Sequence, residues 1–230
     1  MWWTALVLLP AWLYYASIHQ VLVAIFVYWF FGDVVQSLFN HRWAAHSLWT
    51  PPKWLQYTLA TLSTFGFANS PIKWCAYHRT HHAFSDTEKD PHSPKYMHPL
   101  NVALLYRLHA GQIKRAVERI RVKYFVWLEK HELLILLGGH SILFFSVGWL
   151  WYLTIVVPIS YATLAINTVI NYGSHKEGAP KNLSWIWWPL VFSEIYHGSH
   201  HDNPQLNYTK YDVSGWLATR MGWVKNETNR

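Results

Sequence analysis

Hydrophobic residues are gathered into two long uncharged stretches, and charged residues fill the chain around them. Residues 1–32 and 133–175 contain no Asp, Glu, Lys or Arg. A helix needs about 20 mostly apolar residues to cross a hydrocarbon core of about 30 Å. The pattern therefore predicts an all-α integral membrane protein with four transmembrane helices in two hairpins, at about 2–39 and 133–172. A soluble protein with very apolar core helices is the alternative, which 43 consecutive uncharged residues disfavour.

Each hydrophobic stretch contains a place where a hairpin can turn. The first turn is expected near residues 17–20, and the second in the aromatic run at 148–152, which suits a membrane interface. The limb before the first turn, about 2–16, is short and contains Pro10, so it is expected to tilt, to insert thinly or to span only in part. It lacks the basic start and the small-residue cleavage site of a signal peptide, so it is expected to be retained.

All 19 lysine and arginine residues lie between 42 and 130 or between 176 and 230. By the positive-inside rule these segments, and with them both termini, belong on the cytoplasmic side. We therefore expect one domain, 1–230, in which a cytosolic helical cap formed by 40–132 and 173–230 covers the multi-pass membrane part. The net charge of +7 then belongs to a membrane protein, so nucleic acid is not expected as a partner.

Residues 107–123 form a basic stretch in which Ile113, Val117 and Ile120 recur at helical spacing. A helix of this kind suits the anionic headgroups of a lipid bilayer. A solvated basic face and a docking site for an acidic redox partner fit the same pattern.

Fifteen histidines are present, and nine of them fall into four clusters on the charged side of the hydrophobic stretches. The clusters are HRWAAH at 41–46, HRTHH at 78–82, His175, and HGSHH at 197–201. Residues three and four apart share a helix face, so each HxxHH motif presents three imidazoles together. His41 and His46 are five apart and diverge on a regular helix, so their convergence requires an irregular turn.

Nine imidazoles are too many for one first-row metal ion, but they suit a dinuclear site with four or five nitrogens for each ion. The single cysteine, Cys75, excludes an intramolecular disulfide and a cysteine-ligated metal site. Imidazole suits several transition metals, and iron is the usual choice where O₂ is activated. The candidate ligands are His41, His46, His78, His81, His82, His175, His197, His200 and His201. The other histidines, at 19, 92, 98, 109, 131 and 140, lack this spacing and are interpreted as ordinary residues.

Two acids lie near the clusters. Glu194, three residues before His197, shares its helical face and is a candidate to orient a metal ligand from behind. Asp33 lies in a hydrophobic stretch, where an acid is costly, so it is a functional candidate, although a pairing with Arg42 or a polar contact between helices explains it equally well. The aromatic candidates to line a substrate tunnel are Trp43, Trp74 and Phe84, for which plain packing is the alternative.

The histidine motifs resemble, in order and position, the three histidine boxes of the membrane fatty acid desaturase family, particularly its acyl-CoA or Δ9-type branch. SDTEKDPHSP at 85–94, the segment from Asn171 to His175, and Glu194 before the third box add to this resemblance, which runs from about residue 20 to 224. It implies a four-helix transmembrane cone under a cytosolic cap, with two irons held by the nine histidines and Asn171 bound to a metal-held water. The implied reaction uses O₂ and electrons from a separate carrier to insert a cis double bond into a saturated fatty acyl chain.

The resemblance leaves partners and some alternatives open. Ferredoxin and cytochrome b5 are both expected electron donors, because the chain contains neither a fused cytochrome nor a cysteine-rich segment. Ala76 and Tyr77 precede the second box, where acyl-CoA members often carry charged residues, so the acyl carrier is CoA, acyl carrier protein or a glycerolipid. A diiron lipid hydroxylase, a carotenoid or sterol ketolase, and a non-enzymatic membrane metal transporter are the competing functions. The Asn171–His175 pair and DPHSP favour desaturation, and ligands gathered at one membrane face disfavour transport.

Overall fold

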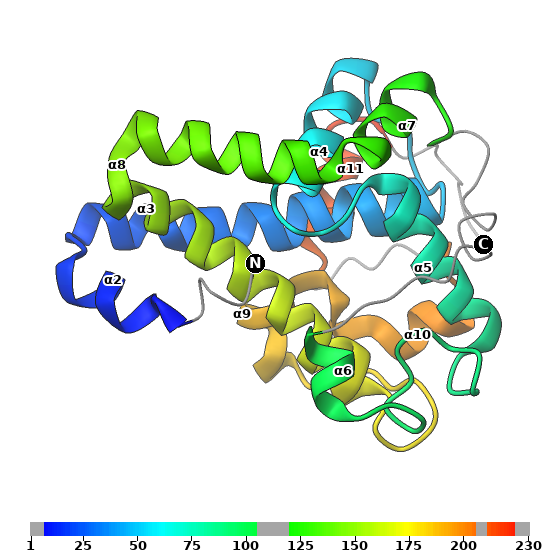
Figure 1. Ribbon diagram of the computed structural model, residues 1–230. Helices are drawn as coiled ribbons and strands as arrows, with labels where there is room; N and C mark the ends of the chain where they lie inside the picture. The colour runs from blue at the N-terminus through cyan, green and yellow to red at the C-terminus, as the bar shows by residue number, and fades with distance from the viewer. Residues whose placement is uncertain (1–6, 105–119, 206–210, 224–230) are drawn as a thin grey trace.

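The computed structural model describes residues 7–104, 120–205 and 211–223 (Figure 1). In these ranges the regular structure is helical and no β-strand occurs, which confirms the all-helical prediction. The α-helices are α2 (Leu9–Tyr15), α3 (Ile18–Trp29), α4 (Lys53–Phe65), α5 (Pro71–Phe84), α6 (Pro99–Leu104), α7 (Lys123–Lys130), α8 (Glu132–Ala165), α9 (Trp188–Val191), α10 (His197–Asp202) and α11 (Val213–Arg220). Two π-helices, η1 (Phe30–Ala45) and η4 (Ile166–Ser174), and two 3₁₀-helices, η5 (Trp185–Trp187) and η6 (Phe192–Tyr196), complete the set. Of the basic stretch at 107–123, residues 107–119 lie outside the described ranges.

Two helical stretches are long and apolar enough to cross a membrane, Ile18–Ala45 and Glu132–Ser174. In Figure 1 α3 runs straight into η1, while α8 folds back at its middle and then crosses α3. The outward surfaces of these stretches carry bulky exposed side chains: Leu22, Phe26, Leu134 and Phe145. Water-soluble proteins rarely expose so much contiguous apolar surface, so these faces suit contact with lipid chains.

The chain turns at both places expected from the sequence. Ser17 caps α3: its side chain accepts the N–H of Gln20, and the Gln20 side chain accepts the N–H of Ser17 at 2.9 Å. Gly148 adopts φ 77°, which divides α8 into a first limb before it and a second limb after it. Only α2, with seven residues, is described before the first turn. The described helices thus give two candidate spans, and the prediction of four stays a prediction.

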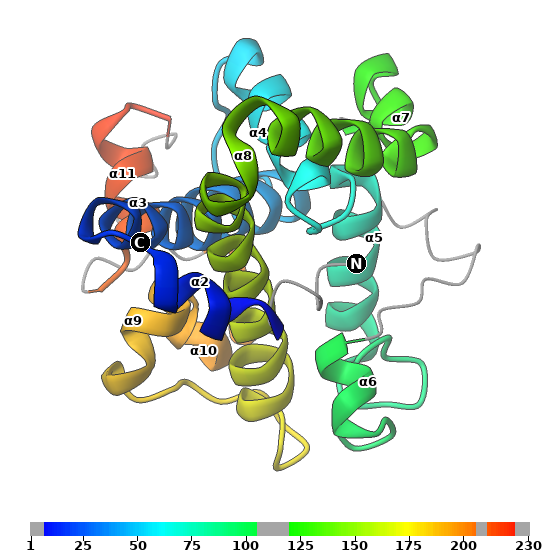
Figure 2. The same ribbon diagram turned by 60° about the vertical axis from the view of Figure 1, so that its left-hand side comes forward.

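The largest buried cluster lies where η1 packs against α4, α5 and α7. These helices lie at the end of the molecule away from the two turns in Figure 1, and on one side of it in Figure 2. Fifteen of the sixteen residues of η1 are buried, so this helix is the central helix around which the others pack. Phe39 and Trp43 on η1 meet Leu59 of α4 and Phe125 of α7 in this cluster. The histidines near the end of η1 are consequently held on a rigid element.

Replacing Gly148 by alanine is expected to destabilise the protein by about 1 kcal/mol, because alanine resists the left-handed conformation of this turn. The matched control is Gly138→Ala in the first limb of α8, where a methyl group meets nothing within 4 Å and the backbone is helical. The control is expected to be neutral or slightly stabilising. Thermal unfolding in detergent measures both variants, and equal melting temperatures would contradict the assigned turn.

Candidate metal centre

The π-helical geometry of η1 brings His41 and His46 together. In a π-helix the hydrogen bonds join residues five apart, so such residues are neighbours on one face. The N–H of His46 donates to the carbonyl of His41 at 3.2 Å, and their ring centroids are 5.2 Å apart. The helix ends just beyond, where Ser47 adopts φ 64°. The irregular turn that the sequence required is therefore a widened helix.

The structure gathers the nine candidate histidines into two groups, in each of which one nitrogen per ring lies within 4.8 Å of the others. The first group is His41, His46, His78, His82 and His200, and the second is His81, His175, His197 and His201. In each HxxHH motif the outer histidines join one group and the middle histidine joins the other. Residues four apart differ by about 40° around a helix, whereas the middle residue lies about 60° to the opposite side of the first. The motif spacing thus lets α5 and α10 each serve both groups.

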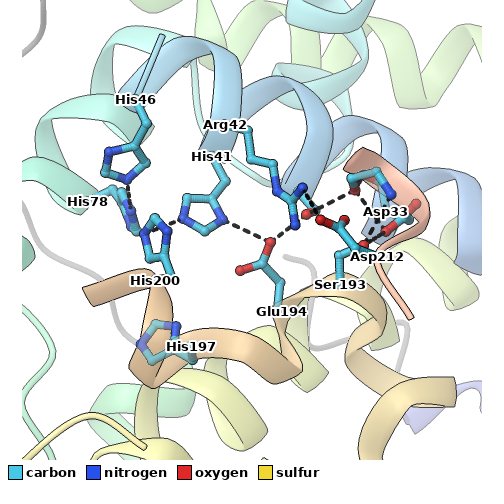
Figure 3. A network of polar contacts seen from close by, with 12 residues as sticks. Asp33, His41, Arg42, His46, His78, Ser193, Glu194, His197, His200 and Asp212 are labelled. Atoms are coloured by element: carbon cyan, nitrogen blue, oxygen red, sulfur yellow. Dashed lines mark hydrogen bonds and ion pairs between the residues drawn. The ribbon is translucent and has the colours of Figure 1, made fainter. Parts of the chain in front are cut away.

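Within the two groups the imidazoles point their Nε2 atoms at one another. Figure 3 shows this for His41, His46, His78 and His200 of the first group. The separations between Nε2 atoms are 2.8 Å for His41 and His200, 2.7 Å for His46 and His78, 2.8 Å for His175 and His197, and 3.1 Å for His81 and His201. Two nitrogens bound at right angles to one metal, with bonds of about 2.1 Å, are about 3.0 Å apart. The donor atoms therefore fit a metal ion in each group.

Carboxylates hold the outer nitrogens of three of these imidazoles. The Nδ1 pairs are His41 with Glu194 at 2.8 Å, His81 with Asp90 at 2.9 Å, and His175 with Asp86 at 3.0 Å. An Nδ1–H that donates to a carboxylate leaves the Nε2 lone pair directed inward, which is the tautomer that binds a metal. Glu194, expected to support a ligand from behind, makes this contact with His41.

Sequence reasoning missed Asp86, Asp90 and His92. His92, interpreted as an ordinary residue, is buried with its ring 4.1 Å from that of His81, and His81, Asp90 and His92 form a third group able to hold a metal ion. The available signal was the acidic run shortly after the HRTHH motif at 78–82. Its acids are brought back onto the centre by the turn that follows α5.

Burial favours the neutral form of seven of these imidazoles, those of His46, His78, His81, His82, His197, His200 and His201. Removal from water, and next the neighbouring rings, lowers the pKa of His82 to about 3 and that of His201 to about 2. The pKa of His81 is held well below its ordinary value for the same reasons. At pH 7 these rings therefore carry no proton charge, and their lone pairs are available to a cation.

A buried polar network joins Glu194 to the C-terminal helix α11 (Figure 3). Ser37 donates to Glu194, and the hydroxyl of Ser214 lies 3.1 Å from that of Ser37 and donates to Asp33 at 2.9 Å. Burial raises the pKa of Glu194, but its interactions with His41, with Arg42 and with the Ser37 hydroxyl outweigh it and lower the value to about 2. The carboxylate facing His41 is thus ionised and fixed in direction.

Asp33 makes polar contacts between helices and is not the partner of Arg42. It accepts hydrogen bonds from Ser193 at 3.0 Å and from Ser214, whereas Arg42 donates to Asp212 at 2.7 Å. Both members of the Arg42–Asp212 pair are buried. Asp33 is therefore connected to the centre through Ser214, Ser37 and Glu194.

A cavity adjoins the histidines, and some of the residues predicted to line a substrate tunnel or to bind near the metal do line it. Trp74, stacked on His78 with ring centroids 4.9 Å apart, lines it together with Asn171 of η4. Trp43 instead packs in the core between Phe39 and Phe125. Phe84 lies half-buried under Lys89 at the end of α5.

Curated proteins resemble the chain over most of its length. It is 30% identical to the sn-1 stearoyl-lipid 9-desaturase of Anabaena variabilis, over 88% of this chain and 77% of that protein. It is 31% identical to the Delta-9 acyl-lipid desaturase 2 of Arabidopsis thaliana, over 85% and 69% of the two chains. The chain belongs to the Δ9-type membrane fatty acid desaturase family. A further desaturase relative is the sn-2 palmitoyl-lipid 9-desaturase of Nostoc sp. (strain 36), 27% identical over 96% and 85% of the chains. No protein-family model matches this desaturase chain.

Replacing Asp90 by asparagine is expected to lower metal affinity about 10–100-fold, because the amide no longer fixes the tautomer of His81. Metal bound per chain, measured by elemental analysis during competition with a chelator, tests this. Glu88→Gln, which removes an exposed carboxylate two residues away, is the control and should bind metal as the parent does. Equal retention by the two variants would contradict the role assigned to Asp90.

Breaking the Arg42–Asp212 pair is expected to destabilise the protein by about 3–5 kcal/mol, because one buried charge loses its partner. Arg42→Met tests this loss through the free energy of unfolding. Combining it with Asp212→Asn, which removes the second charge and keeps an oxygen for the N–H of Gly215, should restore much of the stability. If the double variant were no more stable than Arg42→Met, the unpaired charge of Asp212 would not be the cause of the lost stability.

Proposed function

We propose that the chain is an O₂-dependent fatty acyl desaturase that inserts a cis double bond into the acyl chain of a membrane lipid. The observation that carries this proposal is the pair of inward-facing histidine groups at one end of two apolar helical stretches, in a member of the desaturase family. In the overall reaction two neighbouring methylenes lose one hydrogen each. One O₂ takes up these hydrogens with two electrons and two protons from outside, and two waters leave.

Two iron ions are the proposed cofactor. The first would be held by His41, His46, His78, His82 and His200, and the second by His81, His175, His197 and His201, with Asn171 bound to a metal-held water. Bound iron supplies the oxidising power that side chains lack, since an unactivated methylene has neither an acidic proton nor a leaving group. The chain supplies the imidazoles, carboxylates that fix their direction, and a cavity beside them.

The acyl chain is proposed to lie in the cavity beside the first group. Trp74, His78 and Asn171 line this cavity, and Phe67 borders both it and a second, largely apolar cavity beside the two limbs of α8. A chain threaded along this path would present one pair of methylenes to the histidine groups while its end lies among apolar side chains. Fixing one carbon pair against the oxidising centre is what gives a single double-bond position.

A glycerolipid is the proposed acyl carrier, and carbon 9 the proposed position. Three relatives carry names of acyl-lipid or lipid 9-desaturases. Ala76 and Tyr77, at the position where acyl-CoA members often carry charges, are both buried and present little surface to a CoA. CoA and acyl carrier protein remain the alternatives that a product assay separates.

The proposed topology has four spans in two hairpins, with the cap, the metal centre and both termini on the cytoplasmic side. The two candidate spans, the turns at Ser17 and Gly148, and the restriction of lysine and arginine to the cap segments support it. The electron donor is proposed to be a separate protein, ferredoxin or cytochrome b5, which the basic cap would attract.

Expression in a host with saturated membrane lipids is expected to yield cis-9 unsaturated chains, which gas chromatography of fatty acid methyl esters detects. His82→Ala should form no product while the protein reaches the membrane at the parental level, because the hydrophobic stretches drive insertion without metal. The control His19→Ala removes an exposed histidine outside both groups and should leave product formation unchanged.

Three outcomes would contradict the proposal or part of it. An oxygenated product without a new alkene would indicate a hydroxylase or a ketolase. Full activity of His82→Ala would remove the first group from the reaction. If the protein in purified vesicles converted acyl-CoA but not phosphatidylcholine, the acyl carrier would be CoA and not a glycerolipid.

A further inference from the structure

The segment Trp185-Ile186-Trp187-Trp188-Pro189-Leu190-Val191 lies in the proposed cytosolic cap but has the character of a membrane element. It carries no charge and forms η5 and the short helix α9. Trp185 is 67% exposed and Ile186 66%, and Trp187 and Leu190 are exposed as well. In water this cluster of four bulky side chains on one turn would leave a large apolar area unburied.

The opposite side of the segment is fastened to the candidate spans. Val191 belongs to a buried cluster with Ala165 at the end of α8 and Ile170 of η4. The hydroxyl of Tyr28 on α3 donates to the carbonyl of Leu190 at 2.7 Å, and the ring of Tyr28 packs on that of Phe192 at 5.8 Å. Figure 1 shows α9 beside the α3–η1 rod, away from the cap helices α4 and α7.

These contacts fix the depth of the segment. Tyr28 lies ten residues, roughly 15 Å, along the helix from Ile18. This is about half the thickness of a hydrocarbon core of about 30 Å. A carbonyl within reach of the Tyr28 hydroxyl therefore lies within the depth of the bilayer that Ile18–Ala45 would cross.

The backbone of the segment suits an environment without water. Trp187 N–H donates to Ser184 at 3.0 Å, Trp188 N–H to Trp185, and Phe192 N–H to Trp188. Only irregular backbone whose polar groups are paired within the protein is tolerated at membrane depth. Tryptophan is also the side chain that favours the boundary between headgroups and hydrocarbon.

We propose that residues 185–191 form a re-entrant turn that inserts into the cytoplasmic leaflet, with lipid chains covering its exposed side. The inference rests on the membrane orientation proposed above. The turn lies just before Glu194 and the HGSHH motif at 197–201. Contact between the turn and the lipid would therefore help to fix the position of that motif. It also refines the expected division of the chain, because part of 173–230 lies in the bilayer.

Site-directed spin labelling tests the insertion. A nitroxide is attached to Ile186→Cys, or in a second variant to Trp185→Cys, in a Cys75→Ala background and in phosphatidylcholine vesicles. Phe145→Cys, 84% exposed on the first limb of α8, is the control for lipid contact, and Glu88→Cys, exposed after α5, is the control for water contact. Collision rates with O₂, which concentrates in lipid, and with a water-soluble nickel chelate are measured for each label.

The labels at 185 and 186 are expected to match Phe145: frequent collisions with O₂ and several-fold fewer with nickel than at Glu88. If nickel reached the labels at 185 and 186 as often as it reaches Glu88 while Phe145 stayed shielded, the proposed insertion would be wrong. The proposed membrane spans would not be affected by that result. Nickel access at Phe145 itself would instead contradict the proposed membrane orientation. Line broadening at 186 that disappears on dilution with unlabelled protein would show that a second copy covers the turn, which also overturns the proposal.

Discussion

Nine imidazoles directed at two points are the constraint on which the rest of this structure depends. Rings packed this closely must be buried and fixed in one tautomer, so that their lone pairs face these two points. Burial keeps His82 and His201 uncharged, as their low pKa values show. Carboxylates at the outer nitrogens supply the direction, and each must itself be held. Glu194, which contacts His41, is in turn held by Ser37, and Ser37 is held by Ser214 of α11.

The two π-helices follow from the same constraint. A regular α-helix would separate His41 and His46 by about 140°, so the chain widens where it enters the centre. The candidate span ending at Ser174 widens in the same way before His175. Poorer hydrogen-bond geometry destabilises such helices, and the near-complete burial of η1 offsets that loss. The π-helical widening occurs in η1 and η4, next to the ligands, and not within α3 or α8.

Local spacing predicted much of this arrangement, because both the hydrophobic runs and the HxxHH motifs act over a few residues. Ser17 and Gly148 marked the turns, and the count of imidazoles indicated two groups. Trp74 could have been told from Trp43 by spacing, since it stands four residues before His78 and shares its face, whereas Trp43 stands two after His41. Partners far apart in sequence were out of reach: Asp86 meets His175 and Glu194 meets His41 only through the tertiary fold. Local spacing places these acids near the motifs, but it does not show which imidazole each one contacts.

Each histidine group combines side chains from distant parts of the polypeptide. The first joins His41 to His200, and the second joins His81 to His201. Both groups include histidines of α10, so neither is complete until the chain has been made as far as this helix. A metal ion can therefore meet its full set of ligands only after both apolar helical stretches have been made. The carboxylates that contact His41, His81 and His175 hold rings of both groups in the orientation that a metal ion needs.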